Sequence, residues 1–255
     1  MKRLQIKAVL ILACGLIWQG VYLSGIYSPL LFPSLGTIFA ALARDIMEGA
    51  LVDQFLYSMR LVIEGLFLSL ILGLGIALLA RSSSMFRSGI DLLISIAHPL
   101  PGVALLPLVI LWAGIGEGAI LFIIVHSVLW PFLVSFFGAL DHLPQTQQEV
   151  ADNYEIFGWR RLIWVDLPGS FPGFLSGLKI GWSRAWRALI SAEMIFGATS
   201  GSGGIGWYLF QKRVFMDTAG LFAGLIVIMM IGILIEGLFF RWIERKTVLR
   251  WGMER

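Results

Sequence analysis

Six stretches of the chain consist almost entirely of apolar residues, and polar segments separate them. They cover roughly residues 8–26, 61–80, 92–113, 119–140, 171–196 and 219–240. A helix needs about 20 apolar residues to cross the hydrocarbon core of a bilayer, which is about 30 Å thick. The pattern therefore predicts an all-α membrane protein with six transmembrane helices. Because six is even, both termini are expected on one side of the membrane.

The segment 144–168 departs most clearly from this apolar pattern. It contains EVADNYEIFGWRRLIWVDLP at 149–168, and Pro144 and Pro168 bound it. The sequence predicts two short helices joined near Gly158. Apolar residues at i, i+4 and i+7 give one edge of this segment: Val150, Tyr154 and Phe157. Acidic residues are available on other faces: Glu149, Asp152 and Glu155. A projecting amphipathic helix suits docking to a partner, although an ordinary solvated loop would have the same composition.

Two other regions interrupt the regular pattern. Residues 27–58 begin with two prolines and continue as an amphipathic helix, which suits the outer membrane interface or packing on the helix bundle. Its charged residues are Arg44, Asp45, Glu48 and Asp53. The third apolar stretch contains Pro99, Pro101 and Pro107. Each proline disfavours a straight helix, and broken backbone at membrane depth is tolerated where it is buried in protein or lines a cavity.

The chain is expected to form one domain, because it has no internal repeat and no linker long enough to separate two. Residues 1–58 hold the first span and the outer amphipathic segment. Residues 59–243 form the core with the loop 144–168, and residues 244–255 form a basic tail.

The composition agrees with a membrane protein, because 58% of the residues are hydrophobic and 14% are charged. A soluble domain has about half apolar and a quarter charged residues. The start, MKRLQIK, leads into an apolar stretch without an A-x-A-like cleavage site, so we expect a retained span. The single cysteine, Cys14, excludes an intrachain disulfide and a cysteine metal cluster. The basic residues flank the apolar stretches, which indicates lipid and not nucleic acid as their surroundings.

The basic residues also predict the orientation. The side with both termini receives twelve of them: Lys2, Arg3, Lys7, Arg81, Arg87, Arg160, Arg161, Arg241, Arg245, Lys246, Arg250 and Arg255. The opposite side receives four: Arg44, Arg60, Lys212 and Arg213. Because Lys and Arg concentrate in cytoplasmic loops, both termini and the loop 144–168 are predicted to be cytoplasmic.

The fifth apolar stretch carries a polar stripe. At 100° per residue, most of its members fall within about 120° of one another: Ser176, Lys179, Ser183, Arg184, Arg187 and Ser191. A cation at that depth costs at least about 2.5 kcal/mol unless it faces water or a partner. The cations are therefore expected either to pair with Glu193, Glu236 or Glu64, or to line a translocation path.

Other candidate sites carry little chemistry. The glycine-rich stretch 197–206 lacks the Lys and the strand-helix setting of a phosphate loop, and G-x-x-x-x-G-K-[ST] does not occur in the chain. The three histidines, His98, His126 and His142, share no metal-ligand spacing, and no serine is flanked as a nucleophile elbow. The sequence therefore predicts neither a metal site nor an enzyme.

The loop resembles the cytoplasmic signature loop of membrane-spanning subunits of bacterial ATP-binding-cassette (ABC) importers of the type I fold. In that loop E-A-A, a later glycine and a terminal L-P are spaced over twenty residues. Glu149, Val150, Ala151 and Leu167-Pro168 match this spacing without a gap. Glu155 stands at the glycine position, and Gly158 comes three residues later. Three more stretches resemble the nitrate/sulfonate/taurine group in the right order: FPSLGTI, PLPGVALLPLVILWAGIGE at 99–117 and AEMIFGATSGSGGIGWYL at 192–209.

This resemblance implies a permease subunit in the bacterial cytoplasmic (inner) membrane, spanning it several times. Such subunits pair, here as a homodimer, and each places its loop in a groove of an ABC ATPase subunit. ATP and Mg²⁺ are bound by that ATPase, so no cofactor is expected in this chain. An external solute-binding protein delivers the solute, which is expected to be a small anion of the nitrate, sulfonate or taurine kind.

Two other classes of function are considered. An ATPase-independent channel or secondary carrier would need no signature loop, and an intramembrane enzyme would need a catalytic constellation that the sequence lacks. No residue identifies the solute.

Overall fold

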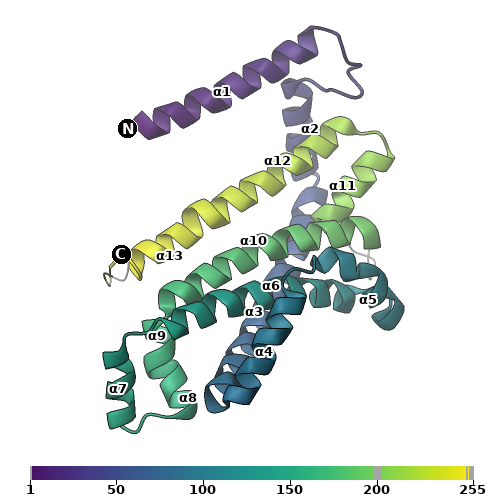
Figure 1. Ribbon diagram of the computed structural model, residues 1–255. Coiled ribbons are helices and arrows are strands. Elements are labelled where there is room, and N and C mark those ends of the chain that lie inside the picture. The colour runs from purple at the N-terminus through teal and green to yellow at the C-terminus, as the bar shows by residue number, and fades with distance from the viewer. Residues whose placement is uncertain (1, 198–202, 251, 253–255) are drawn as a thin grey trace.

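The computed structural model describes residues 2–197, 203–250 and 252. All regular elements in this part of the chain are helical (Figure 1). This agrees with the prediction of an all-α membrane protein.

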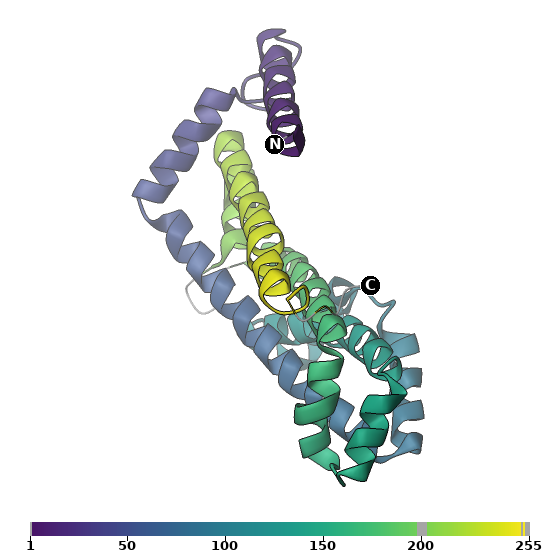
Figure 2. The ribbon, with the colours of Figure 1, turned by 90° about the vertical axis from the view of Figure 1, so that its left-hand side faces the viewer.

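Most of the first helix stands apart from the others. The helix α1 spans Lys2–Leu23 and leads through a turn to α2, Leu35–Met47. Trp18 fixes this connection, because its ring stacks on Phe32 at 4.1 Å and its Nε1–H donates to the Pro33 carbonyl at 3.0 Å. The rest of α1 exposes large apolar side chains. Figure 1 shows most of α1 lying away from the bundle, which it meets at Trp18, whose ring centroid is 4.9 Å from that of Phe222. Figure 2 shows α2 continuing into α3 along one edge.

The helix α3 is longer than predicted. It spans Ala50–Ser82, and its 33 residues extend about 50 Å at 1.5 Å each. Residues 50–58, assigned from the sequence to the outer amphipathic segment, belong to α3 instead. The amphipathic helix is the separate α2, which packs on the helix α12, Thr218–Leu234, and buries Ile38, Ala41 and Asp45.

The predicted break in the third apolar stretch is confirmed. It divides into α4, Ser84–Ala97, a 3₁₀ turn at Gly102–Leu105 and α5, Leu106–Ala113. The two halves are bent by 87°. Pro101 precedes the 3₁₀ turn and Pro107 lies in the first turn of α5, where a proline lacks no intrahelical bond.

The centre of the fold is the pair α6, Glu117–Asp141, and α10, Phe171–Phe196. Phe132 and Phe136 of α6 are fully buried. Three glycines of α10 at intervals of four face α6: a Cβ added to Gly173, Gly177 or Gly181 would come within 3.1 Å of an α6 atom. Small residues at this spacing let membrane helices approach closely. This run of glycines was not predicted from the sequence.

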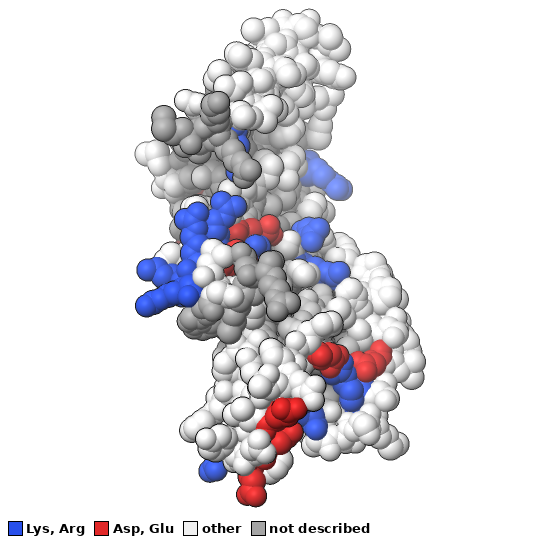
Figure 3. Space-filling view, turned by 60° about the vertical axis from the view of Figure 1, so that its left-hand side comes forward, with Lys and Arg blue, Asp and Glu red and all other residues white. Residues whose placement is uncertain are grey.

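The chain ends with a second helical hairpin. It comprises α11, Ile205–Val214, then α12, Thr218–Leu234, a π-helical stretch at Ile235–Phe240 and α13, Arg241–Lys246. The helix α11 was not predicted, and its first residues belong to the glycine-rich stretch 197–206. Figure 1 places the start of α1, the end of α13 and the segment α7–α9, residues 145–169, at the same end of the long helices. Figure 3 shows Lys and Arg side chains gathered on a face toward this end.

Four described helices are long and apolar enough to cross a membrane: Gln5–Leu23, Ala50–Ser82, Glu117–Asp141 and Thr218–Lys246. The bent pair α4 and α5 makes a fifth if it is counted as one span. The helix α10 is also long enough, but Lys179, Arg184, Arg187 and Glu193 lower its hydropathy.

Candidate functional site

The loop after α6 forms two helical pieces, as its sequence predicted. The first is α7, Gln145–Asn153. The second begins with α8, Gly158–Arg161, and continues through a π-helical stretch, Leu162–Asp166, into α9, Leu167–Gly169. Pro144 precedes α7. Leu167 and Pro168 lie where the loop returns to α10.

The apolar residues of this loop project from the fold. The side chains of Val150, Tyr154 and Phe157 are 50%, 76% and 62% exposed. They do not form the single helix edge that the spacing predicted, because α7 ends at Asn153 and Phe157 directly precedes α8. Ala151 is fully buried and anchors α7, whereas Glu149, Asp152 and Glu155 are exposed.

The turn between the two pieces uses left-handed backbone at two positions. Glu155 has φ +52° and Gly158 has φ +59°. Glu155 thus adopts the conformation that favours glycine at the position where the signature pattern has one. For an L-residue this conformation costs about 1–2 kcal/mol.

We expect Glu155→Gly to be tolerated and to leave stability unchanged or raise it by up to about 1 kcal/mol, because relief of this strain outweighs the backbone entropy of glycine. Gly158→Ala should lower stability by about 1 kcal/mol. An added Cβ at Gly158 meets no atom within 4 Å, so backbone conformation alone would produce the effect. Thermal unfolding of the two purified variants checks this. A less stable Glu155→Gly variant would contradict the explanation.

A chain of charged residues connects the loop to α3. Asp166 is 1% exposed, and its Oδ1 accepts a hydrogen bond from Arg81 Nη2 at 2.9 Å. Arg161 Nε lies 3.8 Å from the same oxygen, and Arg161 Nη1 pairs with Asp152 of α7. Asp166 was not predicted from the sequence as a functional residue. A lone acid within the apolar run LIWVDLP was the available signal.

The structure separates the residues of the α10 stripe. Lys179 Nζ pairs with Glu244 of α13 at 2.9 Å, and Ser176 is exposed. Arg187 Nε donates to the Ser183 carbonyl at 3.0 Å, and Ser191 Oγ donates to the Arg187 carbonyl at 2.9 Å. Neither Arg184 nor Arg187 forms an ion pair with a carboxylate in the described part of the chain.

The acids considered as partners are mostly engaged elsewhere. Glu64 lies near Arg60 at 3.7 Å. Glu193 is buried and accepts hydrogen bonds from Ser58 Oγ at 2.7 Å and from the Gly206 amide at 2.8 Å. Glu193 therefore caps the start of α11 and joins it to α3. Lys179 pairs with an acid that was not among those considered.

Arg184, Arg187 and Ser191 line one pocket of about 270 Å³. The broken third stretch and α6 supply further polar side chains: His98, His126, Ser127 and Trp130. The pocket therefore brings together two histidines that are far apart in sequence. His142 lies elsewhere, and its Nδ1 is 2.6 Å from the Gly138 carbonyl oxygen. The described residues contain no group of three or more His, Cys, Asp or Glu that could hold a metal ion.

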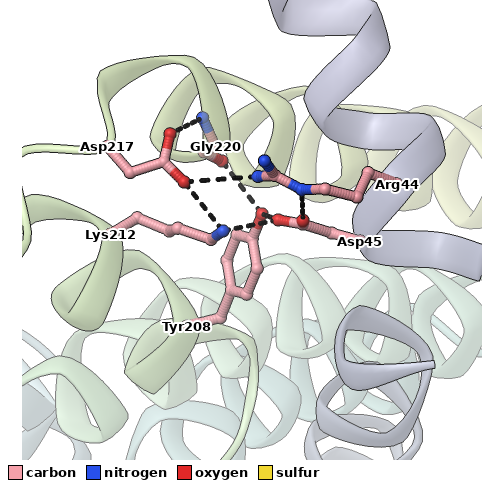
Figure 4. A network of polar contacts seen from close by, with 6 residues as sticks. All are labelled: Arg44, Asp45, Tyr208, Lys212, Asp217 and Gly220. Carbon is pink, nitrogen blue, oxygen red and sulfur yellow. Dashed lines mark hydrogen bonds and ion pairs between the residues drawn. The ribbon is translucent and has the colours of Figure 1, made fainter. Parts of the chain in front are cut away.

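A second polar cluster holds α2 against the opposite end of the bundle (Figure 4). Asp45 is 4% exposed and accepts hydrogen bonds from Tyr208 Oη at 2.6 Å and Arg44 Nε at 2.9 Å. Lys212 Nζ lies 2.6 Å from Asp45 and 2.9 Å from Asp217. Figure 4 shows Asp45 and Asp217 on either side of the Lys212 ammonium.

The ion pairs of this cluster shift the pKa of its members. Burial alone would raise the pKa of Asp45, but hydrogen bonds from Lys212, Tyr208 and Arg44 hold it below its usual value. Burial alone would lower the pKa of Lys212, but Asp45 and Asp217 raise it. The cluster therefore stabilises the fold fully between the unfolded pKa values of about 4 and about 10. Its contribution falls as pH drops through the lowered pKa of Asp45 or rises through the raised pKa of Lys212.

A helical bundle with several membrane-spanning helices and an exposed helical loop at one end is the architecture of a multi-pass membrane permease. Residues 65–249 match the family described as binding-protein-dependent transport system inner membrane component, and the chain belongs to this family. The family comprises transport permeases, not enzymes, and a location in the bacterial inner membrane is consistent with it.

Named relatives cover most of the chain. A Bacillus subtilis (strain 168) protein whose name refers to aliphatic sulfonates transport is 30% identical over 251 residues, 98% of this chain and 87% of its own. The taurine transport system permease protein of Escherichia coli (strain K12) is 27% identical over 90% of this chain and 84% of its own. A bicarbonate transport system permease protein of Synechococcus elongatus is 25% identical over 82% and 73%.

Proposed function

We propose that the chain is the membrane-spanning subunit of an ATP-driven importer of a small anion. The observation that carries this proposal is the exposed helical loop between α6 and α10, with Glu149 and Leu167-Pro168 at the signature spacing. A channel or secondary carrier that needs no ATPase has no use for such a loop. The relatives named for sulfonates, taurine and bicarbonate favour an anionic solute.

The proposed topology has six spans and cytoplasmic termini. It adds α10 to the five spans that hydropathy favours, because its 26 residues extend about 39 Å and it packs along α6. The distribution of basic residues supports a cytoplasmic location for the loop and for both termini.

The proposed transporter complex consists of a pair of these chains, two ATPase subunits and an external binding protein. Closure of the ATPase dimer on ATP would move the two loops and switch the paired bundles between outward and inward access. ATP and Mg²⁺ belong to the ATPase subunits. The solute would pass along α10, where Arg184, Arg187 and Ser191 offer donors to an anion. Ser183 holds Arg187 in place, while Lys179, through its pair with Glu244, joins α10 to α13.

One reconstitution tests this function and topology together. After mild detergent extraction, an ATPase should copurify with the chain. In liposomes that hold the complex with its ATPase side outward, transport should occur only when ATP is added outside. An impermeant thiol reagent should label Gln145→Cys and Arg255→Cys from that same side; Arg255 lies outside the described residues. Transport without an ATPase, or labelling of either position from the opposite side, would refute the corresponding part.

A further inference from the structure

The pocket beside the broken third stretch is built from the break and two helices of one chain. Pro101, Gly102 and Val103 come from the break, His126 and Trp130 from α6, and the two arginines from α10. Gly102 makes this approach feasible, because a Cβ there would lie 2.3 Å from Ser127 Oγ. Irregular backbone at membrane depth is tolerated beside a cavity. The break and the pocket thus account for each other.

The charge of the pocket is positive. Arg184 and Arg187 are among its lining residues, and those residues include no Asp or Glu. Arg184 lies at the middle of the 26-residue helix α10, far from either end. Two arginines at that depth without a carboxylate partner require water or an anion to offset their desolvation. This observation favours an anionic ligand.

Two aromatic residues of the pocket have unused hydrogen-bonding groups. His126 Nδ1 and Trp130 Nε1 are buried and have no hydrogen-bond partner among the described residues. Their rings lie edge to face, with centroids 6.1 Å apart. The Trp130 N–H can only donate. An unpaired buried donor is costly. Less than 1 Å² of either atom is exposed, so a ligand with acceptor oxygens would relieve that cost after a turn of the ring that brings the N–H into the pocket.

The remaining lining is apolar and the space is larger than a bare inorganic anion needs. Leu100, Pro101, Val103, Pro131 and Ala188 contribute apolar surface. At about 30 Å³ for each water-sized group, 270 Å³ holds about nine such groups. A nitrate ion would leave most of this space empty, whereas a short alkanesulfonate would fill more of it.

We infer that this pocket is an anion-binding site within each subunit and that it binds an organic anion with a short apolar body. Its anionic head lies between Arg184 and Arg187, and its apolar body packs on the proline-rich wall. The planar guanidinium fork suits the paired oxygens of a sulfonate or carboxylate. This inference rests on the proposed transport of an anion, but it concerns binding by this chain alone.

Equilibrium dialysis tests this site, with radiolabelled butanesulfonate as the probe. The full chain is used in nanodiscs, without ATPase or ATP. Butanesulfonate should bind, nitrate should compete at least about 10-fold more weakly, and uncharged butanesulfonamide should not compete. Arg187→Gln should weaken binding by about 10- to 100-fold, the usual effect of losing a charge-assisted hydrogen bond. Trp130→Phe, which keeps the ring and removes the N–H, should weaken it by a smaller factor.

The matched control is Arg213→Gln, which removes the same charge from α11, outside the pocket, and should bind butanesulfonate as the wild type does. Thermal unfolding of each variant separates loss of the site from loss of the fold, and Arg187 is exposed enough for its replacement to leave the fold intact. The proposed binding site would be refuted if butanesulfonate did not bind to the wild type, or if it bound equally well to Arg187→Gln. Equal affinity for nitrate would overturn the organic class. Either outcome would leave the proposal of ATP-driven transport standing. Failure of an ATPase to copurify would refute the proposed function, but it would not change the result of the binding experiment.

Discussion

Phe157→Asp is expected to abolish stable association with the ATPase subunit. The Phe157 side chain is 62% exposed although it is large and apolar, and it stands at the turn between α7 and α8. If this turn enters a packed groove, an aspartate there loses its hydration without gaining a partner. A buried aromatic anchor at an interface contributes about 2 kcal/mol or more by itself. The combined effect should weaken association by at least about 100-fold.

Copurification and ATP-driven transport measure this effect, and Tyr154→Asp should act in the same direction. Phe157→Leu keeps an apolar side chain and should retain association. Leu249→Asp is the matched control, because Leu249 is a 47% exposed apolar residue near the C-terminus and outside the loop. Wild-type association and transport by Phe157→Asp would mean that the loop is a connector.

Arg81→Met is expected to lower the free energy of unfolding by about 2–3 kcal/mol and to impair coupling. The variant leaves the Asp166 carboxylate, which is 1% exposed, with Arg161 Nε at 3.8 Å as its remaining cation. Breaking a buried ion pair by removing one partner costs about 3–5 kcal/mol. The lower figure applies here because Arg161 remains and because the Arg81 side chain is 30% exposed.

The double variant Arg81→Met/Asp166→Leu separates this explanation from simple loss of packing. Replacing both partners of a buried pair by apolar residues is often neutral, so the double variant should regain most of the lost stability. If Asp166 also transmits motion from the loop to α3, the double variant should hydrolyse ATP with reduced transport per ATP. An additive loss of stability in the double variant would exclude an interaction between the two residues.

The sequence by itself determined the class of this protein. Apolar stretches of span length, the signature spacing from Glu149 to Pro168 and the prolines of the third stretch are local patterns. Each follows from the solvent that a segment must face or from the backbone that a residue permits. For that reason the membrane-spanning helices, the broken third span and the two-part loop were predictable. The sequence shows that Glu155 stands where the signature pattern has a glycine, but it does not show that Glu155 adopts a left-handed conformation.

The tertiary structure decided which polar residues meet. Asp166 pairs with Arg81, Glu193 with Ser58, and Asp45 with Lys212. These partners are separated by 85 or more residues and by no regular spacing. It also divided the stripe on α10, because Lys179 faces α13 while Arg184 and Arg187 face the pocket. A helical wheel gives the direction of a side chain around its own axis but not the neighbour that lies there. That neighbour is set by close packing of α10 on α6 through glycines, and so by the shapes of two helices together.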